Sequence, residues 1–341
     1  MALDKRKWGL ILTVLLGLVA VLAPQSVQAK TSNSYTLTAQ LPPTQTNQQV
    51  TYFDLTAAEN SIQPLAVAVH NTSQQQLTVK LAANDAYTAN NGLIAYDRAT
   101  VKSLSAPQSL RFSQLVQGKR AQSVTLAAGE TKQVTFKVKM PDAPFSGLIL
   151  GGIRSVAALG DDGNNVQNKV AYNLSVVLRH SATPVLPQVK LARILPGSRL
   201  AKSGLLVRLR NSKPNIVSQM TFKGTVTQLG KAKVLSTYKQ QELQMAPYSE
   251  LNYFMPTKLL QPGNYVLHLQ LTGRDGYAQT LTKRFHVDKG QQISMNDQKK
   301  AVAKTNWWLY IGIGAVVVLA VAGATYWAYR KGRIGGPRHR K

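Results

Sequence analysis

Two clusters of side chains have the composition of binding sites rather than of catalytic centres. The first comprises Tyr87, Asn90, Asn91 and Tyr96, which lie in one loop. Tyrosine rings stack on the faces of sugars, and amides form hydrogen bonds with hydroxyl and acetamide groups. The loop therefore has the composition of a glycan-binding site. The alternative is a long polar loop whose tyrosines are held in the protein core.

The second cluster is cationic and consists of Arg208, Arg210 and Lys213. The two arginines are two residues apart in an expected strand, so they share one face, with Lys213 just beyond the strand. This row of cations predicts a patch that binds anionic ligands. A solvated sheet face explains the same residues equally well.

No catalytic or metal site is expected from the sequence. The chain has no cysteine, and its five histidines are not spaced as zinc ligands. Asp161 and Asp162 begin the string DDGNN, which lacks the ligand spacing of an EF-hand calcium loop and favours an exposed turn. We therefore predict a protein without enzyme activity and without a cofactor.

The N-terminus has the pattern of a secretory signal peptide. Basic residues at positions 5–7 precede an apolar run, and Val27-Gln28-Ala29 places small residues where a cleavage site requires them. We expect residues 1–29 to be removed, so that the mature chain begins at Lys30. The alternative is an uncleaved membrane helix, which the polar residues after Pro24 disfavour.

A second apolar stretch, residues 307–329, predicts a transmembrane helix. Its 23 residues carry no charge, and at about 1.5 Å per residue a helix of this length spans the hydrocarbon core. Aromatic residues flank it at both ends, as is typical of membrane interfaces. The tail at 330–341 contains six basic residues, which the positive-inside rule keeps in the cytoplasm. A single-pass protein with its N-terminus and body outside the cell membrane is therefore predicted.

The positioning elements of the outer body are expected to be strands. From residue 30 onward, short alternating segments are broken by Gly, Pro, Asn and Ser, a pattern typical of antiparallel sandwiches. We predict an all-β body of two tandem Ig-like β-sandwich domains, residues 30–160 and 161–288. A polar stalk at 289–306 then leads to the single C-terminal transmembrane α-helix.

The charge of the chain is strongly basic, with a formal net value of +27. Residues 30–160 contain 11 basic and 6 acidic residues, whereas residues 161–329 contain 21 and 7, so the excess lies in the second half. A field of this sign favours polyanionic neighbours. Outside a cell these are teichoic polymers, anionic lipid headgroups or acidic proteins, and nucleic acid is not an expected partner.

Strings of residues along the whole body resemble one known family. In the first half these are IQPLAVAVHNTSQQQLTVKLAANDAYTANNGLIAYD, LAAGETKQVTFKVKMP and PFSGLILGGI; in the second they are AYNLSVVLR, VSQMTFKGTVTQLG, MAPYSELNY and LQPGNYVLHLQLTGRDG. They are similar to the N-terminal peptidoglycan-binding domain and the C-terminal host-binding domain of the WxL-interacting proteins of Gram-positive bacteria. The signal peptide, the single membrane span and the basic tail are also shared.

The resemblance implies a non-catalytic, membrane-anchored cell-surface scaffold. Its implied partners are peptidoglycan, surface proteins that carry a WxL domain, and host matrix proteins. The alternative function is an adhesin whose basic second domain binds host extracellular matrix or polyanions such as teichoic polymers. No family motif assigns ligand contacts residue by residue. The prediction that the two clusters above bind ligands therefore depends only on the chemistry of their side chains.

Overall fold

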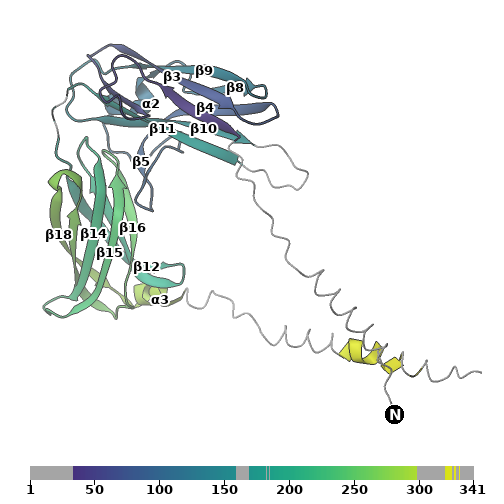
Figure 1. Ribbon diagram of the computed structural model, residues 1–341. Helices are drawn as coiled ribbons and strands as arrows, with labels where there is room; N and C mark the ends of the chain where they lie inside the picture. Colours follow the sequence, from purple (N-terminus) through teal and green to yellow (C-terminus); the bar gives the residue numbers. More distant parts are fainter. Residues whose placement is uncertain are drawn as a thin grey trace, which may run out of the picture. The chain divides into compact units, whose positions relative to one another are not determined.

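The computed structural model describes residues 34–158, 169–181, 183, 185–297, 319–324, 326, 327 and 330. The chain divides into two compact units, each built almost entirely from strands (Figure 1). The prediction of an all-β body is therefore confirmed.

The predicted membrane-associated segments fall largely beyond these residues. The signal peptide, most of the 307–329 stretch, the basic tail apart from Arg330 and the predicted boundary at residue 160 lie outside the described residues. Among the residues that are described, no helix is both long enough and apolar enough to span a bilayer. The transmembrane helix at 307–329 stays a prediction.

Among the described residues, unit 1 comprises 34–84, 112–143, 151–158 and 169–178. A four-stranded sheet has the order β1 (Tyr35–Gln40), β3 (Ile62–Asn71), β9 (Thr131–Lys139), β7 (Val116–Gln117). A five-stranded sheet has the order β2 (Phe53–Thr56), β11 (Lys169–Arg179), β10 (Ile149–Ala158), β4 (Leu77–Asp85), β8 (Ala121–Leu126). The short helix α2 (Phe112–Leu115) precedes β7.

Period-two burial explains how these strands form a core. On β3, Leu65, Val67 and Val69 are fully buried, and the residues between them are partly exposed. The buried Tyr35 of β1 joins the two sheets, because its hydroxyl lies 2.8 Å from Ser155 Oγ on β10. Burial raises the pKa of Tyr35 above its usual value, with the hydrogen bond to Ser155 acting in the opposite direction.

Unit 2 is a second two-sheet sandwich. One sheet has the order β12 (Val189–Arg199), β13 (Lys202–Asn211), β16 (Glu250–Pro256). The other has the order β15 (Val234–Met245), β14 (Val217–Gln228), β17 (Gly263–Thr272), β18 (Ala278–Val287), with the 3-10 turn η2 (Arg274–Gly276) between its last two strands. Buried side chains from both sheets form one core.

Two segments from the first half of the chain also belong to unit 2. They are Asp85–Arg111 and Pro144–Leu150. The first contains the hairpin of β5 (Tyr87–Thr88) and β6 (Ile94–Ala95), followed by η1 (Gln108–Leu110). The second is bound by a hydrogen bond from the Leu148 N–H to the Pro214 carbonyl, 2.8 Å. The compact units are thus not continuous in sequence.

The structure also differs from expectation in the first half of the predicted stalk. Residues Lys289–Asp297 form helix α3, which begins where Asp288 Oδ1 accepts a hydrogen bond from the Gln291 N–H at 2.7 Å. Met295 is 1% exposed and joins the core of unit 2. The hydroxyl of Ser203 on β13 donates to the Met295 carbonyl at 2.8 Å. A single buried methionine in a polar segment therefore docks the helix.

The same turn occurs once in each unit, at Asn71 and at Asn211. Both side chains are fully buried at the end of a strand. Asn71 Nδ2 donates to the carbonyls of Gln75 and Ala127, each at 2.8 Å, and Asn211 Nδ2 donates to those of Asn215 (2.6 Å) and Ala246 (3.0 Å). Each Oδ1 accepts a backbone N–H two residues later in the chain. Each asparagine amide thus closes its own turn and also binds a carbonyl group of a second turn that is distant in sequence.

Replacing either asparagine with alanine should destabilise its unit by about 2–4 kcal/mol, because buried carbonyls lose their donor. The measurement is the free energy of unfolding in urea for Asn71→Ala and Asn211→Ala. The matched control is Asn173→Ala on β11, since Asn173 is exposed and accepts a surface hydrogen bond from Arg154. That change should stay within about 0.5 kcal/mol of the parent protein. Equal effects at all three positions would contradict this account.

Candidate functional site

The tyrosines of the predicted glycan loop are buried in unit 2. Tyr87 is 4% and Tyr96 is 8% exposed. The Tyr87 hydroxyl donates to Asp97 Oδ1 at 2.6 Å, and the Arg98 guanidinium lies 4.2 Å from the centre of its ring. Burial, followed by the hydrogen bond to Asp97, raises the pKa of Tyr87. The two rings therefore have a packing role and do not present open faces to a sugar.

The hairpin that carries this loop is held by the turn between β15 and β16. The Thr88 hydroxyl is hydrogen-bonded to Ser249 and accepts the Ala246 N–H at 2.9 Å. Farther along, Ser105 donates its N–H (2.9 Å) and its hydroxyl (2.8 Å) to the Tyr248 carbonyl. Tyr248 also packs against a small core that includes Tyr87. These contacts fix the direction in which the hairpin tip points.

The tip presents Asn90 and Asn91, which are both exposed. They line a cavity of about 390 Å³ together with Gln240, Tyr253 and Phe254, and residues of the β12–β13 hairpin complete its wall: Arg199, Leu200 and Lys202. We call this the amide cavity. It offers three amides, one half-buried phenylalanine ring and two cations. That set of groups suits a small polar ligand with an apolar face, such as a sugar ring.

Tyr253 in the wall of the amide cavity contacts two further aromatic residues. The Tyr253 and Tyr238 hydroxyls are 2.9 Å apart, and the Phe222 ring packs 5.3 Å from that of Tyr253. Burial, reinforced by the hydrogen bond to Tyr238, raises the pKa of Tyr253 well above its usual value. Tyr253 is thus a neutral wall residue at physiological pH.

The two arginines of the predicted cationic cluster have cross-strand partners in the structure. On β13, Arg208 Nε donates to Asn252 Oδ1 at 2.8 Å, and Arg210 forms an ion pair with Glu250 of the neighbouring β16. The strand register places each arginine opposite its partner. Lys213 lies beyond the strand in a different site. Cross-strand pairing therefore neutralises the row at Arg210.

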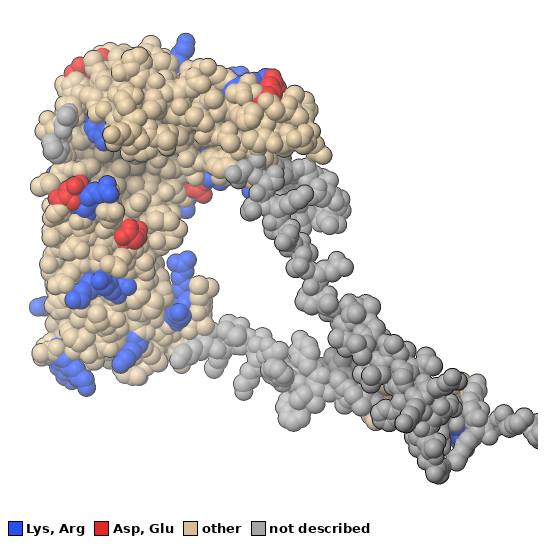
Figure 2. Space-filling model, in the orientation of Figure 1, with Lys and Arg blue, Asp and Glu red and all other residues tan. Residues whose placement is uncertain are grey.

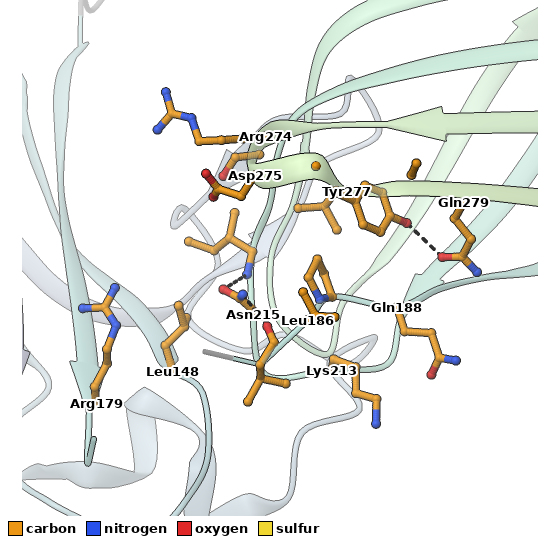
Figure 3. Close-up of a pocket in the computed structure, with 17 residues that line it drawn as sticks. Leu148, Arg179, Leu186, Gln188, Lys213, Asn215, Arg274, Asp275, Tyr277 and Gln279 are labelled. Carbon is orange, nitrogen blue, oxygen red and sulfur yellow. Dashed lines mark hydrogen bonds between the residues drawn. The ribbon is translucent and has the colours of Figure 1, made fainter. Parts of the chain in front are cut away.

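Lys213 lines a groove of about 880 Å³ at the end of unit 2 where β13 ends (Figure 3). We call it the basic groove, because Arg179 and Arg274 line it together with Lys213, against one carboxylate, that of Asp275. Leu148 and Leu186 supply apolar wall. This combination suits an acidic, partly apolar segment of a macromolecule rather than a small metabolite.

Gln279 fixes one wall of the basic groove. Its amide donates to the Val189 carbonyl at 2.7 Å and accepts the Val189 N–H at 3.1 Å, which ties β18 to β12. The Tyr277 hydroxyl donates to the same side chain at 3.0 Å. Burial raises the pKa of Tyr277 to about 12. This wall of the groove is therefore built from neutral groups. The positive charge of the groove comes from Arg179, Lys213 and Arg274.

Groups suited to metal binding do not cluster in the described part of the chain. No three His, Asp or Glu side chains there are close enough to hold a metal ion. The strand histidines are bonded to neutral partners: His70 Nδ1 lies 2.9 Å from Thr131 Oγ1, and His286 Nδ1 lies 2.8 Å from Asn264 Oδ1.

Comparison with protein families gives two matches that together span most of the body. Residues 35–156 match the WxL Interacting Protein, peptidoglycan binding domain, and residues 161–297 match the WxL Interacting Protein, host binding domain. Both models describe binding domains, which agrees with the prediction of a protein that is not an enzyme. A comparison with curated proteins finds no match.

Solved structures similar to this chain include three chaperones. The YadV chaperone is 12% identical at a TM-score of 0.29, covering 74% of this chain and 100% of its own. The E. coli chaperone DraB is 12% identical at a TM-score of 0.29, and the match covers 75% of this chain and 96% of DraB. The Pseudomonas aeruginosa CupB2 chaperone is 14% identical at a TM-score of 0.27, and the match covers 69% of this chain and 98% of CupB2. At TM-scores this low, the likeness carries no functional inference.

Gly92 at the hairpin tip yields a stability prediction. Its φ is +80°, and a Cβ there would lie 2.4 Å from Cδ2 of Leu243, a side chain that is 3% exposed. Gly92→Ala should therefore cost about 1–3 kcal/mol beyond the cost of the positive φ. Gly118→Ala is the matched control, since Gly118 has a φ of +77° and nothing within 4 Å. Urea unfolding of both variants measures the difference, and equal losses would refute the packing argument.

Proposed function

This chain belongs to the WxL Interacting Protein family, and on that premise we propose that it is a non-catalytic, membrane-anchored scaffold that binds peptidoglycan and joins WxL-domain proteins in a cell-surface complex. The matches to a peptidoglycan binding domain and a host binding domain support the two binding roles. The apolar 307–329 stretch and the basic tail support anchoring by one helix, with the body outside a Gram-positive cell.

The amide cavity is the proposed contact with the glycan of peptidoglycan. The observation that carries this assignment is the placement of Asn90 and Asn91, which are exposed and lie beside the Phe254 ring. Both asparagines belong to the range matched by the peptidoglycan binding domain. In the proposed complex the amides bond to acetamide and hydroxyl groups, and the ring packs against the sugar face.

Sedimentation with insoluble peptidoglycan tests this assignment. We expect residues 30–306 to sediment with it, and Asn90→Ala with Phe254→Ala to weaken binding about tenfold or more, through the loss of one hydrogen bond and one ring contact. Asn173→Ala, in unit 1, is the matched control and should bind as the parent does. The shorter fragment 30–160 is unsuitable, because Asp85–Arg111 packs within unit 2.

Two results would decide against the proposal. Absence of sedimentation at both low and moderate salt removes the peptidoglycan-binding role. Sedimentation that the double substitution leaves unchanged keeps that role and removes the amide cavity as its site.

The basic groove favours a second candidate function, the binding of a host or surface macromolecule. Arg274 is held in place by the hydrogen bond from its Nε to Gln219 Oε1 at 3.2 Å, and Lys213 is exposed. Because Arg210 is paired with Glu250, the basic groove is a better candidate for an acidic partner than the β13 row. Host matrix proteins and teichoic polymers supply such acidic segments.

Charge reversal at Lys213 tests this second function. Lys213→Glu should weaken the affinity for heparin, used as a polyanionic probe, about threefold or more, and added salt should shrink the difference. Lys137→Glu, an exposed position on β9 of unit 1, makes the same change of net charge elsewhere. Calorimetric titration at two salt concentrations measures both variants. Equal losses at the two positions would show that net charge, not the groove, governs binding.

A further inference from the structure

One end of unit 2 has the chemistry of a membrane-contacting surface. We call it the α3 end and define it as residues 198–203, 228–234, 256–264 and 287–297. We propose that the α3 end binds anionic lipid headgroups, so that unit 2 stands on the bilayer instead of being held away from it by a free tether. The proposal rests on the membrane anchor of the proposed function.

Hydrogen bonds hold the four segments of the α3 end together. Ser198 Oγ donates to the Ser294 carbonyl at 2.7 Å, and Gln292 Nε2 donates to Gln261 Oε1 at 2.7 Å. The Leu229 N–H donates to the Asn264 carbonyl at 2.9 Å. The strand register also places one end of each of the pairs β12–β13, β14–β15 and β17–β18 at this surface. The α3 end is therefore one continuous surface.

Exposed apolar side chains gather on this surface. In residues 185–297, five of the six exposed large hydrophobic residues lie at the α3 end: Leu200 (84%), Ile293 (58%), Val234 (51%), Leu229 (40%) and Leu259 (37%). The sixth, Leu186, lies at the opposite end of the unit. Apolar residues collected at one end of a sandwich point to a partner that accepts them.

Of these five residues, Leu200 gives the strongest evidence for a partner. It occupies the β12–β13 turn with Ala201, and both have positive φ, 49° and 60°. Glycine and asparagine are the residues that adopt this conformation with little strain. A leucine that is 84% exposed gains almost nothing from packing in return. Its side chain thus stands at the tip of a hairpin, where it also borders the amide cavity and where a partner can cover it.

Cations surround the apolar residues. The α3 end contains Arg199, Lys202, Lys231, Lys233, Lys258 and Lys289, against the two carboxylates Asp288 and Asp297. Blue Lys and Arg atoms are visible at the lower end of this unit in Figure 2, where Figure 1 places α3. Leucines interspersed with lysines match the boundary between anionic headgroups and acyl chains. An anionic wall polymer would engage the cations but leave the leucines in water.

The exit of the chain places this surface close to the bilayer. Helix α3 ends at Asp297, and nine residues separate it from the apolar 307–329 stretch. Nine residues span at most about 30 Å. Three of them are lysines, at positions 299, 300 and 304, which an anionic surface also attracts. With the anchor inserted, contact requires no rearrangement of unit 2.

A site-specific fluorescence experiment tests the contact in the full chain. Since the protein has no cysteine, Leu200→Cys creates one labelling site for an environment-sensitive fluorophore. The labelled protein is reconstituted into phosphatidylglycerol–phosphatidylcholine vesicles that contain a lipid with a nitroxide quencher near its headgroup. Leu186→Cys is the matched control, because Leu186 is 80% exposed at the opposite end of the same unit.

We expect the probe at position 200 to be quenched about threefold or more compared with the probe at 186. Vesicles of phosphatidylcholine alone should abolish most of the difference, as should Lys231→Glu with Lys233→Glu, because both remove the electrostatic attraction. Because both lysines are exposed, we expect their substitution to leave the fold intact. Circular dichroism of each variant checks that the protein is folded.

The outcomes separate this proposal from the anchor on which it rests. Extraction of the chain by alkaline carbonate would show that the anchor is wrong, and the contact falls with it. Retention in the membrane with equal quenching at 200 and 186 overturns the contact alone. Equal quenching of position 200 in neutral and anionic vesicles overturns the role of anionic headgroups. A response to soluble polyphosphate with none to the lipid quencher identifies a wall polymer instead.

Discussion

The hydrogen bonds by which Thr88 and Ser105 bind the β15–β16 turn decide where the rest of the candidate site lies. Thr88 bonds to Ser249 and to the Ala246 N–H, and Ser105 bonds twice to the Tyr248 carbonyl. They bring a segment from the range matched by the peptidoglycan binding domain into unit 2. Only in that position do Asn90 and Asn91 stand beside Phe254. The amide cavity is thus built from residues more than 150 positions apart in the chain.

Local pattern explains how much of the fold was predictable. Alternation of apolar and polar residues identified strands such as β3 and β17, because burial in a sandwich follows a period of two. In each unit one strand ends in a turn that begins with a buried asparagine, and Asn71 and Asn211 make equivalent bonds there. Helix α3 was missed because its composition is polar and one residue, Met295, docks it.

Long-range partners explain what the sequence did not reveal about the site. Tyr87 and Tyr96 have the composition of stacking platforms, but their burial depends on packing partners such as Tyr248 that no local pattern indicates. Arg208 and Arg210 do share a strand face, yet the register with β16 sets Glu250 opposite Arg210. The basic groove likewise joins Arg179, Lys213 and Arg274, which no spacing rule connects. Asn90 and Asn91 are exposed in the structure, as residues of a polar loop are expected to be, because exposure of a loop is a local property.

The interleaving of the two units also constrains the order in which the protein can fold. Synthesis proceeds from the N-terminus, so Asp85–Arg111 is made long before the β15–β16 turn that receives it. Until residues 245–249 arrive, the Tyr87 cluster has no partner and remains in water. Contacts over such sequence separation slow folding, since loop closure comes before the gain from burial. The body therefore folds as a whole, and a chain cut between the two matched domains separates Asp85–Arg111 from the turn that receives it.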